Sequence, residues 1–355
     1  MPVTAIRSVE DAEAFIASMR QFARDHAAAW KQDMQLRPCP FCGQDVPEPA
    51  EPFTDSFEVS RCRSCRSLYV NPVPTHEQLR FFYRQAEPIR ILNRIYANRV
   101  GRSSGFVNDT RMQQVMEYLA CSRSDASRNP SALEIGCNTG QFLDSLATTA
   151  ASRGLQFERL VGIDIDDSVL PASGSTEAEF RLMDVHQAAS CPEFQSAFDL
   201  IFHFELIEHL PDPAAFMRAA ATLLRPGGYM VFTTPNAVGM EMELAGYNDY
   251  RLMSHGIFPP MHLNAFSTFN MALFAVRSGF FLISMETPGK LDVDCAVRYR
   301  QKSDAMEPVF EALADHDQDT LGMIQALVAR LRASSTLLVV LQRPFYGPES
   351  PNFPD

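Results

Sequence analysis

The chain has 355 residues, of which 46% are hydrophobic and 21% are charged, and its formal net charge is −12. This length is enough for one large domain or two to three small ones with a substantial core. The 26 phenylalanines can bury much apolar surface, which excludes a chain that is disordered throughout. The acidic total argues against a general nucleic-acid binder.

Membrane and export segments are absent from the sequence pattern. No apolar run reaches the ~20 residues that span a bilayer, and the first ten residues lack the apolar core of a signal peptide. We therefore expect a cytoplasmic protein without a membrane span. In that compartment the eight cysteines are expected to be thiols or metal ligands rather than disulfides.

The charge is unevenly distributed along the chain. Residues 1–130 hold 17 basic and 15 acidic side chains, whereas residues 131–355 hold 14 and 28. Residues 60–128 hold 12 basic and 5 acidic side chains, and arginine supplies the positive charge. Because arginine pairs bidentately with carboxylate and phosphate, this segment is a candidate site for an anionic ligand. The alternative is a solvated, basic helical face.

Residues 1–36 are predicted to be an N-terminal helical segment. Its helix, at 8–31, begins at Ser8, which can cap it, and carries apolar residues at helical spacing. Pro38 ends this segment.

Residues 37–72 contain two C-x-x-C pairs, Cys39 with Cys42 and Cys62 with Cys65. Two such pairs at this spacing are typical of a zinc ribbon with four cysteine ligands. A redox pair is the alternative, but a redox C-x-x-C normally opens a helix in a βαβ unit, and these pairs do not. A structural zinc ion is therefore predicted, since four thiolates leave no open position for water.

Residues 73–128 are predicted to be a helical linker on the substrate side of the protein. Its helices are expected at 75–86, 89–96 and 109–120. The polar, breaker-rich stretch 121–130 marks a domain boundary.

Residues 129–345 alternate between strand and helix patterns. Strands are predicted at 132–135, 160–165, 180–183, 198–202, 228–233, 280–285 and 336–342, with insertions at about 237–267 and 290–333. Helices are expected at 141–149, 214–224, 268–278 and, within the second insertion, 303–333. The fold class is therefore α/β, a Rossmann-like, doubly wound sheet of seven strands.

A glycine-containing turn follows the first of these strands, at Gly136-Cys-Asn-Thr-Gly140, and Glu134 precedes it. Such a turn lets the backbone approach a ligand at the carboxyl end of the sheet. The dinucleotide and P-loop fingerprints are absent. Asp164 ends the second strand, where a carboxylate can accept from ribose hydroxyls, and Asp184 ends the third. Taken singly, an aspartate at such a position is more often a helix cap or turn residue.

As an ordered set, these motifs resemble class I S-adenosylmethionine (SAM)-dependent methyltransferases. The resemblance rests on Leu133–Gly140, Val161–Asp164, Met183–Val185, Asp199–Leu210 and Leu224–Tyr229. It extends to the segment Pro259–Ser267, which resembles the branch containing ubiquinone-biosynthesis O-methyltransferases and deoxysugar C-methyltransferases. The latter also begin with a four-cysteine zinc module.

The resemblance implies a role for particular residues in cofactor binding. Gly136 and Gly140 would lie alongside the methionine part of SAM, Asp164 would hold the ribose, and Asp184 would hold the adenine. Val185 could offer its backbone N–H to the adenine ring, and Phe204 would flank the sulfonium. Glu134 and Ile165, beside these motifs, complete the predicted cofactor contacts.

Methyl transfer to oxygen or carbon needs a general base, for which histidine is the usual candidate near neutral pH. His262 and His209 are the first candidates and His255 is the next, because they lie after the fourth strand or in the insertion 237–267. Either of the first two could instead be a structural histidine bonded to the loop backbone. Glu205, Glu208 and His209 could alternatively ligate a divalent metal. Ordinary packing thiols are expected at Cys121, Cys137, Cys191 and Cys295.

The sequence favours a small-molecule acceptor, with an anionic one such as a nucleotide-linked sugar or phosphorylated metabolite suggested by the arginine-rich segment. An RNA or protein methyltransferase that reads its substrate through the ribbon is the first alternative. A non-catalytic SAM-binding scaffold is the second.

Overall fold

The structure, a computed structural model, describes residues 9–49, 57–97, 112, 115, 128–171, 177–240, 256–289, 292–293, 297, 312–313 and 315–345. The predicted cap Ser8, most of the predicted helix at 109–120, and the candidate base His255 lie outside these residues. In the part of the chain that is described, no helix is long and apolar enough to cross a membrane.

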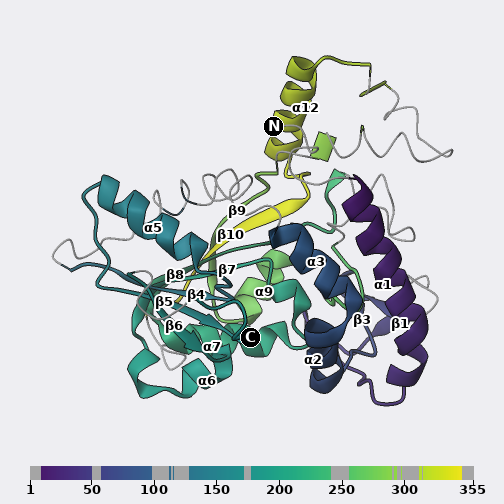
Figure 1. Cartoon of the computed structure of the whole chain (residues 1–355), viewed down its shortest axis with the longest axis horizontal. Coiled ribbons are helices and arrows are strands. Elements are labelled where there is room, and N and C mark those ends of the chain that lie inside the picture. The colour runs from purple at the N-terminus through teal and green to yellow at the C-terminus, as the bar shows by residue number, and fades with distance from the viewer. Residues whose placement is uncertain are drawn as a thin grey trace.

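A seven-stranded sheet forms the centre of the protein (Figure 1), with strand order β6-β5-β4-β7-β8-β10-β9. The first five strands in sequence run parallel, and β10 is antiparallel to both of its neighbours. The strands are β4 (Ser131–Ile135), β5 (Arg159–Asp164), β6 (Glu179–Leu182), β7 (Phe198–Phe204), β8 (Leu224–Pro235), β9 (Phe281–Glu286) and β10 (Thr336–Gln342). The predicted class, a Rossmann-like doubly wound α/β fold, is confirmed.

Helices cover both faces of this sheet because its strands are apolar on both sides. On β7, Phe198 and Ile201 pack in one cluster with α6 (Val185–Ser190), α7 (Pro213–Leu223) and α9 (Met271–Arg277). Leu200 and Phe202 pack in another with α5 (Gln141–Ser152) and with Met112 and Val115. Figure 1 shows α5 on the opposite side of the sheet from α6 and α7.

All seven predicted strands are present, and one of them differs notably in its bounds. Strand β8 begins at Leu224 rather than at residue 228, because Leu224 already pairs with Phe198. The register shifts before Leu200 pairs with Tyr229, so that residues 225–228 bulge opposite Asp199. The predicted helix at 303–333 is described only in part, as α12 (Gln318–Arg330).

The N-terminal region contributes three helices and a small sheet. Helices α1 (Val9–Trp30), α2 (His76–Gln85) and α3 (Glu87–Ala97) lie together beside the large sheet (Figure 1). The small antiparallel sheet consists of β1 (Pro47–Pro49), β2 (Val59–Cys62) and β3 (Leu68–Val70). Helix α2 begins with a capping box in which Thr75 and Gln78 bond each other's backbone N–H.

The N-terminal helices and the small sheet share one apolar core with residues 257–265 of the first predicted insertion. This core brings Phe15 and Trp30 of α1 together with Phe82 of α2 and with Phe258 and Leu263 of the insertion. Residues 257–265 therefore pack on the N-terminal region, although more than 150 residues separate them in sequence.

Candidate active site and four-cysteine metal site

The glycine turn lies at the carboxyl edge of the parallel strands. Gly136 and Gly140 have φ angles of 75° and 73°, and Gly140 precedes the first residue of α5. The N–H groups of Gly136 and Cys137 both donate to the carbonyl of Ile163 in β5, at 2.8 and 3.1 Å. A Cβ on Gly140 would lie 2.4 Å from Cζ of Phe180. The turn is thus held tightly against β5 and β6.

Asp164 ties the glycine turn to the end of β5. Its Oδ2 accepts from the N–H of Asn138 at 2.9 Å, and its Oδ1 accepts from the N–H of Asp166 at 3.0 Å. Each carboxylate oxygen has two lone pairs, so both retain capacity to accept from a further donor such as a ribose hydroxyl.

The other predicted cofactor residues lie at the same edge. Asp184 caps α6, where its Oδ1 accepts from the N–H groups of His186 and Gln187, both at 2.8 Å. Ile165 is 65% exposed beyond β5, and Glu134 and Val185 are buried. The ring of Phe204 packs on Phe142, with centroids 4.6 Å apart.

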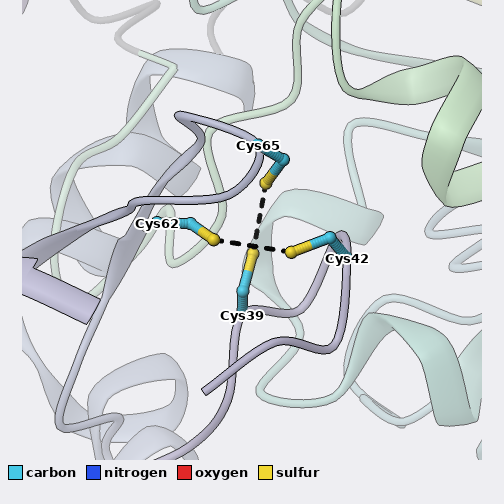
Figure 2. A group of neighbouring side chains, drawn as sticks. All are labelled: Cys39, Cys42, Cys62 and Cys65. Carbon is cyan, nitrogen blue, oxygen red and sulfur yellow. Dashed lines mark hydrogen bonds between the residues drawn. The ribbon is translucent and has the colours of Figure 1, made fainter. Parts of the chain in front are cut away.

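The four cysteines of the two C-x-x-C pairs come together as predicted (Figure 2). The Sγ atoms of Cys39 and Cys65 are 3.6 Å apart and those of Cys42 and Cys62 are 3.4 Å apart. All four sulfur atoms lie within 4.8 Å of one another. Tetrahedral zinc with Zn–S bonds of about 2.3 Å requires sulfur separations of about 3.8 Å, so the cluster fits this ion.

Each cysteine pair lies on its own backbone turn, and the two turns have the same hydrogen-bond pattern. Cys39 donates to the carbonyl of Gln44 and accepts from Gly43; Cys62 donates to the carbonyl of Ser67 and accepts from Arg66. The residue after each second cysteine has a positive φ, 71° at Gly43 and 61° at Arg66.

The charge at this cluster also favours a cation. Burial raises the pKa of the Cys39 and Cys42 thiols, whereas at Cys65 burial is outweighed by hydrogen bonds with Ser67, which lower its pKa. Binding through four thiolates would bring buried negative charge, which a divalent cation compensates. A zinc ion would bind Cys39, Cys42, Cys62 and Cys65 and act as a structural crosslink.

Two of the candidate bases, His209 and His262, lie together. His209 belongs to the short helix η3 (Ile207–His209) after β7, and His262 follows the turn after Phe258. Their ring centroids are 4.8 Å apart at an interplanar angle of 66°. Leu206, just before η3, lies 3.5 Å from the position of a Cβ on Gly136. The backbone segment that leads into η3 therefore lies beside the glycine turn.

Hydrogen bonds fix the ring of His209. Its Nδ1 lies 2.8 Å from the carbonyl oxygen of Met261, which can only accept, so Nδ1 carries the proton. Tyr83 of α2 donates to the same carbonyl at 3.2 Å, and its Oη is 3.0 Å from Nδ1. Nδ1 of His209 is thus bonded to the loop backbone, the structural role considered for this histidine, while Nε2 lies 3.7 Å from Oε1 of Glu208.

Burial keeps the side chains of His209 and Tyr83 neutral. It lowers the pKa of His209 from 6.5 to about 4, against opposing hydrogen bonds to the backbone at Met261 and Glu205. Burial, with the charge of Glu208, raises the pKa of Tyr83 above its ordinary value. At neutral pH, His209 is therefore an uncharged imidazole and Tyr83 an uncharged phenol.

Of the two carboxylates near this pair, Glu208 lies beside the histidines and Glu205 does not. Among the described residues, Glu208, His209 and His262 have ligand-type atoms within 4.8 Å of one another. Glu205 is not part of this group, and its φ of 50° separates it from η3, so Glu205, Glu208 and His209 do not share a helical turn. Thr234 donates to Oε2 of Glu208 at 2.8 Å.

Three residues of this site were not singled out by the sequence patterns: Tyr83, Arg37 and Asn264. Tyr83 lies on the predicted helix at 75–86, Arg37 lies in a segment without a motif, and Asn264 lies in the family-like segment Pro259–Ser267, where no role was predicted for it. Each acts through contacts with residues more than 50 positions away. Such contacts leave no local spacing signal.

Comparison with known proteins identifies the family of the chain. The family described as "Methyltransferase domain" matches residues 84–284, which is more than half of the chain. The chain belongs to this family. The class I SAM-dependent methyltransferase predicted from the motifs is thereby confirmed.

Individual relatives match over shorter stretches. The ubiquinone biosynthesis O-methyltransferase of Marinobacter nauticus is 30% identical over 111 residues, which cover 30% of this chain and 44% of that protein. The corresponding enzyme of Stutzerimonas stutzeri is 31% identical over 137 residues, covering 37% and 52%. The chain thus spans about half the length of these curated relatives.

Solved structures give a more distant likeness. The plantazolicin methyltransferase BpumL matches with 14% identity and a TM-score of 0.44, over 75% of this chain and 94% of that one. A SAM-dependent methyltransferase from Archaeoglobus fulgidus has 14% identity and a TM-score of 0.40, over 66% and 94%.

Proposed function

We propose that this methyltransferase transfers a methyl group from SAM to a small-molecule acceptor, with His209 and His262 beside the reacting centre. The observation that carries the proposal is the contact of His262 with His209, a half-buried histidine three residues after Leu206, which lies beside the glycine turn. The names of the relatives, O-methyltransferases, favour an oxygen nucleophile.

Bound SAM supplies an electrophilic methyl group on its sulfonium. The chain's residues would place the acceptor in line with that methyl group, which accounts for much of the rate of such a transfer. A neutral imidazole can take the proton that the acceptor's nucleophile loses as it bonds the methyl carbon. Nε2 of His209 carries no proton, since Nδ1 donates to Met261. Tyr83 would keep this tautomer in place.

The predicted cofactor contacts form part of the same proposal. Asp164 would accept from the ribose, Asp184 and Val185 would bind the adenine, and Gly136 and Gly140 would pass the methionine part. Because Oδ1 of Asp184 already accepts two backbone N–H groups as the cap of α6, Asp184 would bind the adenine through its remaining lone pairs. Glu134, Ile165 and Phe204 would complete the walls of this site.

An anionic acceptor is favoured by two arginines on α2. Several arginines of the basic segment are engaged by carboxylates, including Arg63 and Arg66 with Glu48, and Arg90 and Arg94 with Glu87. Within the described part of the chain, exposed Arg80 and Arg84 form no ion pair, and they flank Tyr83 on α2. They could contact a phosphate group of the acceptor.

Isothermal titration with SAM tests the cofactor site. Asp164→Asn should weaken binding by about tenfold or more, since a hydrogen bond to a charged group contributes about 1.5–3 kcal/mol. Asp167→Asn, an exposed carboxylate three residues away, is the matched control and should leave the affinity unchanged. Equal affinities for the wild type and Asp164→Asn, or no binding to the wild type, would refute the assignment.

A panel of acceptors tests the substrate class. Release of S-adenosylhomocysteine would be measured with nucleotide-linked sugars, phosphorylated metabolites and their neutral analogues. Faster turnover of the anionic members, lost in an Arg80→Ala, Arg84→Ala double variant, would support the proposal. Equal turnover of neutral and anionic members would contradict the anionic preference, while leaving methyl transfer itself intact.

A further inference from the structure

The segment that carries His262 is bonded on both sides to other parts of the chain. On one side, the N–H groups of Leu263 and Asn264 donate to the carbonyl of Glu208 at 2.7 and 3.2 Å. On the other, Val70 donates to Leu263 at 2.9 Å, and Ala265 donates to Leu68 at 3.1 Å. Residues 263–265 therefore lie between η3 and β3, as a short extension of the small sheet.

The side chain of Asn264 strengthens the first of these contacts. It is fully buried, and its Nδ2 donates to the carbonyls of Leu210 at 2.8 Å and Glu208 at 3.3 Å. These carbonyls lie on either side of His209 in sequence. Asn264, two residues after His262, thus bonds the backbone on both sides of His209.

Arg37 joins the same segments from the N-terminal region. Its guanidinium donates to the carbonyls of Pro211 at 2.6 Å, Leu263 at 3.0 Å and Val70 at 3.1 Å. Pro211 follows η3, Leu263 follows His262, and Val70 ends β3. A planar guanidinium with five donors can bond three such carbonyls at once, whereas a lysine ammonium offers a single point charge.

The four-cysteine site lies next to this junction. Arg37 precedes Cys39 by two residues, and β3, which begins three residues after Cys65, presents Val70 to Arg37. The cysteine turns also pack on the large domain: Phe41 contacts Phe266, with ring centroids 5.0 Å apart.

We propose that Arg37 and Asn264 are positioning residues that hold His262 against His209, and that the four-cysteine module is thereby part of the support of the histidine pair. The proposal rests on the proposed function for its catalytic meaning. By bonding the carbonyls of Pro211, Leu263 and Val70 at once, the Arg37 guanidinium adds to the direct bonds that Asn264 makes between the two histidine segments. Without it, the segments can shift, and displacements of about 1 Å already cost much of a positioned reaction.

The experiment uses the full chain loaded with zinc and labelled with ¹⁵N-histidine. The ring nitrogen signals of His209 and His262 are assigned with His209→Gln and His262→Gln, and are then recorded for Arg37→Met, Arg37→Lys and Asn264→Leu. Arg343→Met is the matched control, since Arg343 also donates to a backbone carbonyl, that of Leu224, but at β8 and β10. SAM affinity and zinc content are measured on each variant.

Both ring signals should shift or broaden in Arg37→Met and Asn264→Leu and stay unchanged in Arg343→Met. Arg37→Lys should restore them only in part. SAM affinity should remain within about twofold of the wild type, and zinc at one ion per chain, because neither residue touches those sites.

Unchanged ring signals in both variants would overturn the proposal. So would a joint loss of ring signals, SAM binding and zinc in every variant, because Arg37 and Asn264 would then merely support the fold. Failure of the wild type to bind SAM would instead refute the proposed function, and the comparison of ring signals would still test the positioning of the pair.

Discussion

At the scale of single residues, two histidines near the end of β7 have very different surroundings. His209 has a defined bond to the loop backbone, whereas His203, the second-last residue of β7, lies between Phe232 and Phe216. Within the described structure neither ring nitrogen of His203 has a hydrogen-bond partner. His203 is thus a packing residue, in contrast to the role proposed for His209.

His203→Phe is expected to stabilise the protein by about 1–3 kcal/mol, the cost of a buried polar group without a partner. Burial lowers the pKa of His203 from 6.5 to about 3. The unfolded chain therefore binds an extra proton as the pH falls below 6.5, and stability is lost from there toward pH 3. Denaturant unfolding at several pH values should show that the free energy of unfolding falls less in acid for His203→Phe than for the wild type. The exposed His186→Phe is the control; an equal acid response in both variants would contradict this explanation.

The pH dependence of turnover tests the role of His209. A base with a pKa of about 4 stays unprotonated well below neutrality, so kcat/KM should be flat from about pH 8 to about pH 5. His209→Asn should lower kcat by about 10²–10⁴ while SAM affinity is kept. The measurement uses the best acceptor of the panel. An acidic decline centred near pH 6.5 would identify a different base.

At the scale of elements, the glycine turn is shaped by the strands on which it rests. Gly140 faces Phe180 of β6 and cannot gain a Cβ without moving that ring, whereas Gly154, past the other end of α5, has no neighbour within 4 Å. Both have a positive φ, of 73° and 70°. The two glycines differ in packing, not in backbone conformation.

Gly140→Ala and Gly154→Ala therefore form a matched pair. Each should lose about 1–2 kcal/mol of stability through the left-handed backbone conformation. Only Gly140→Ala should also displace the turn and weaken SAM binding, by about tenfold or more. Calorimetry with SAM and thermal unfolding of both variants make the comparison. A similar loss of affinity in Gly154→Ala would show that the effect comes from global destabilisation.

At the scale of the whole molecule, the N-terminal region and the methyltransferase domain are packed as one body in the described structure. Phe41, on the first cysteine turn, lies fully buried against Phe266 and Phe274. Asn270 donates to Ser67 at 3.0 Å, and Arg277 donates to the carbonyl of Cys42. The cysteine-bearing segment, predicted as a separate unit at 37–72, is thus attached to the domain at several points.

Phe41→Ala should lower the free energy of unfolding by about 3–5 kcal/mol, because it leaves a cavity in a shared core. Calorimetry should show one shifted transition for the whole chain. Phe81→Ala, whose ring is 37% exposed, should cost about 1 kcal/mol. If Phe41→Ala instead produces a separate early transition, the ribbon unfolds independently and supports no other part.

Much of this architecture follows from local patterns in the sequence. Alternating apolar strands and helices predicted all seven strands of the sheet, because strands buried on both faces need continuous apolar runs. The spacing of Cys39, Cys42, Cys62 and Cys65 predicted their convergence, since each pair occupies one tight turn.

Other features depend on contacts between distant segments. The structure pairs His209 with His262, adds Tyr83 to them and replaces Glu205 by His262 beside Glu208. Strands β1 and β3 and helix α6 are too short for a periodic signal. Residue types and spacings determined the fold and the cysteine cluster because both arise from short-range geometry. Only the tertiary structure decided which histidines meet, because folding brings residues 37, 83, 209 and 262 together through packing that no local pattern encodes.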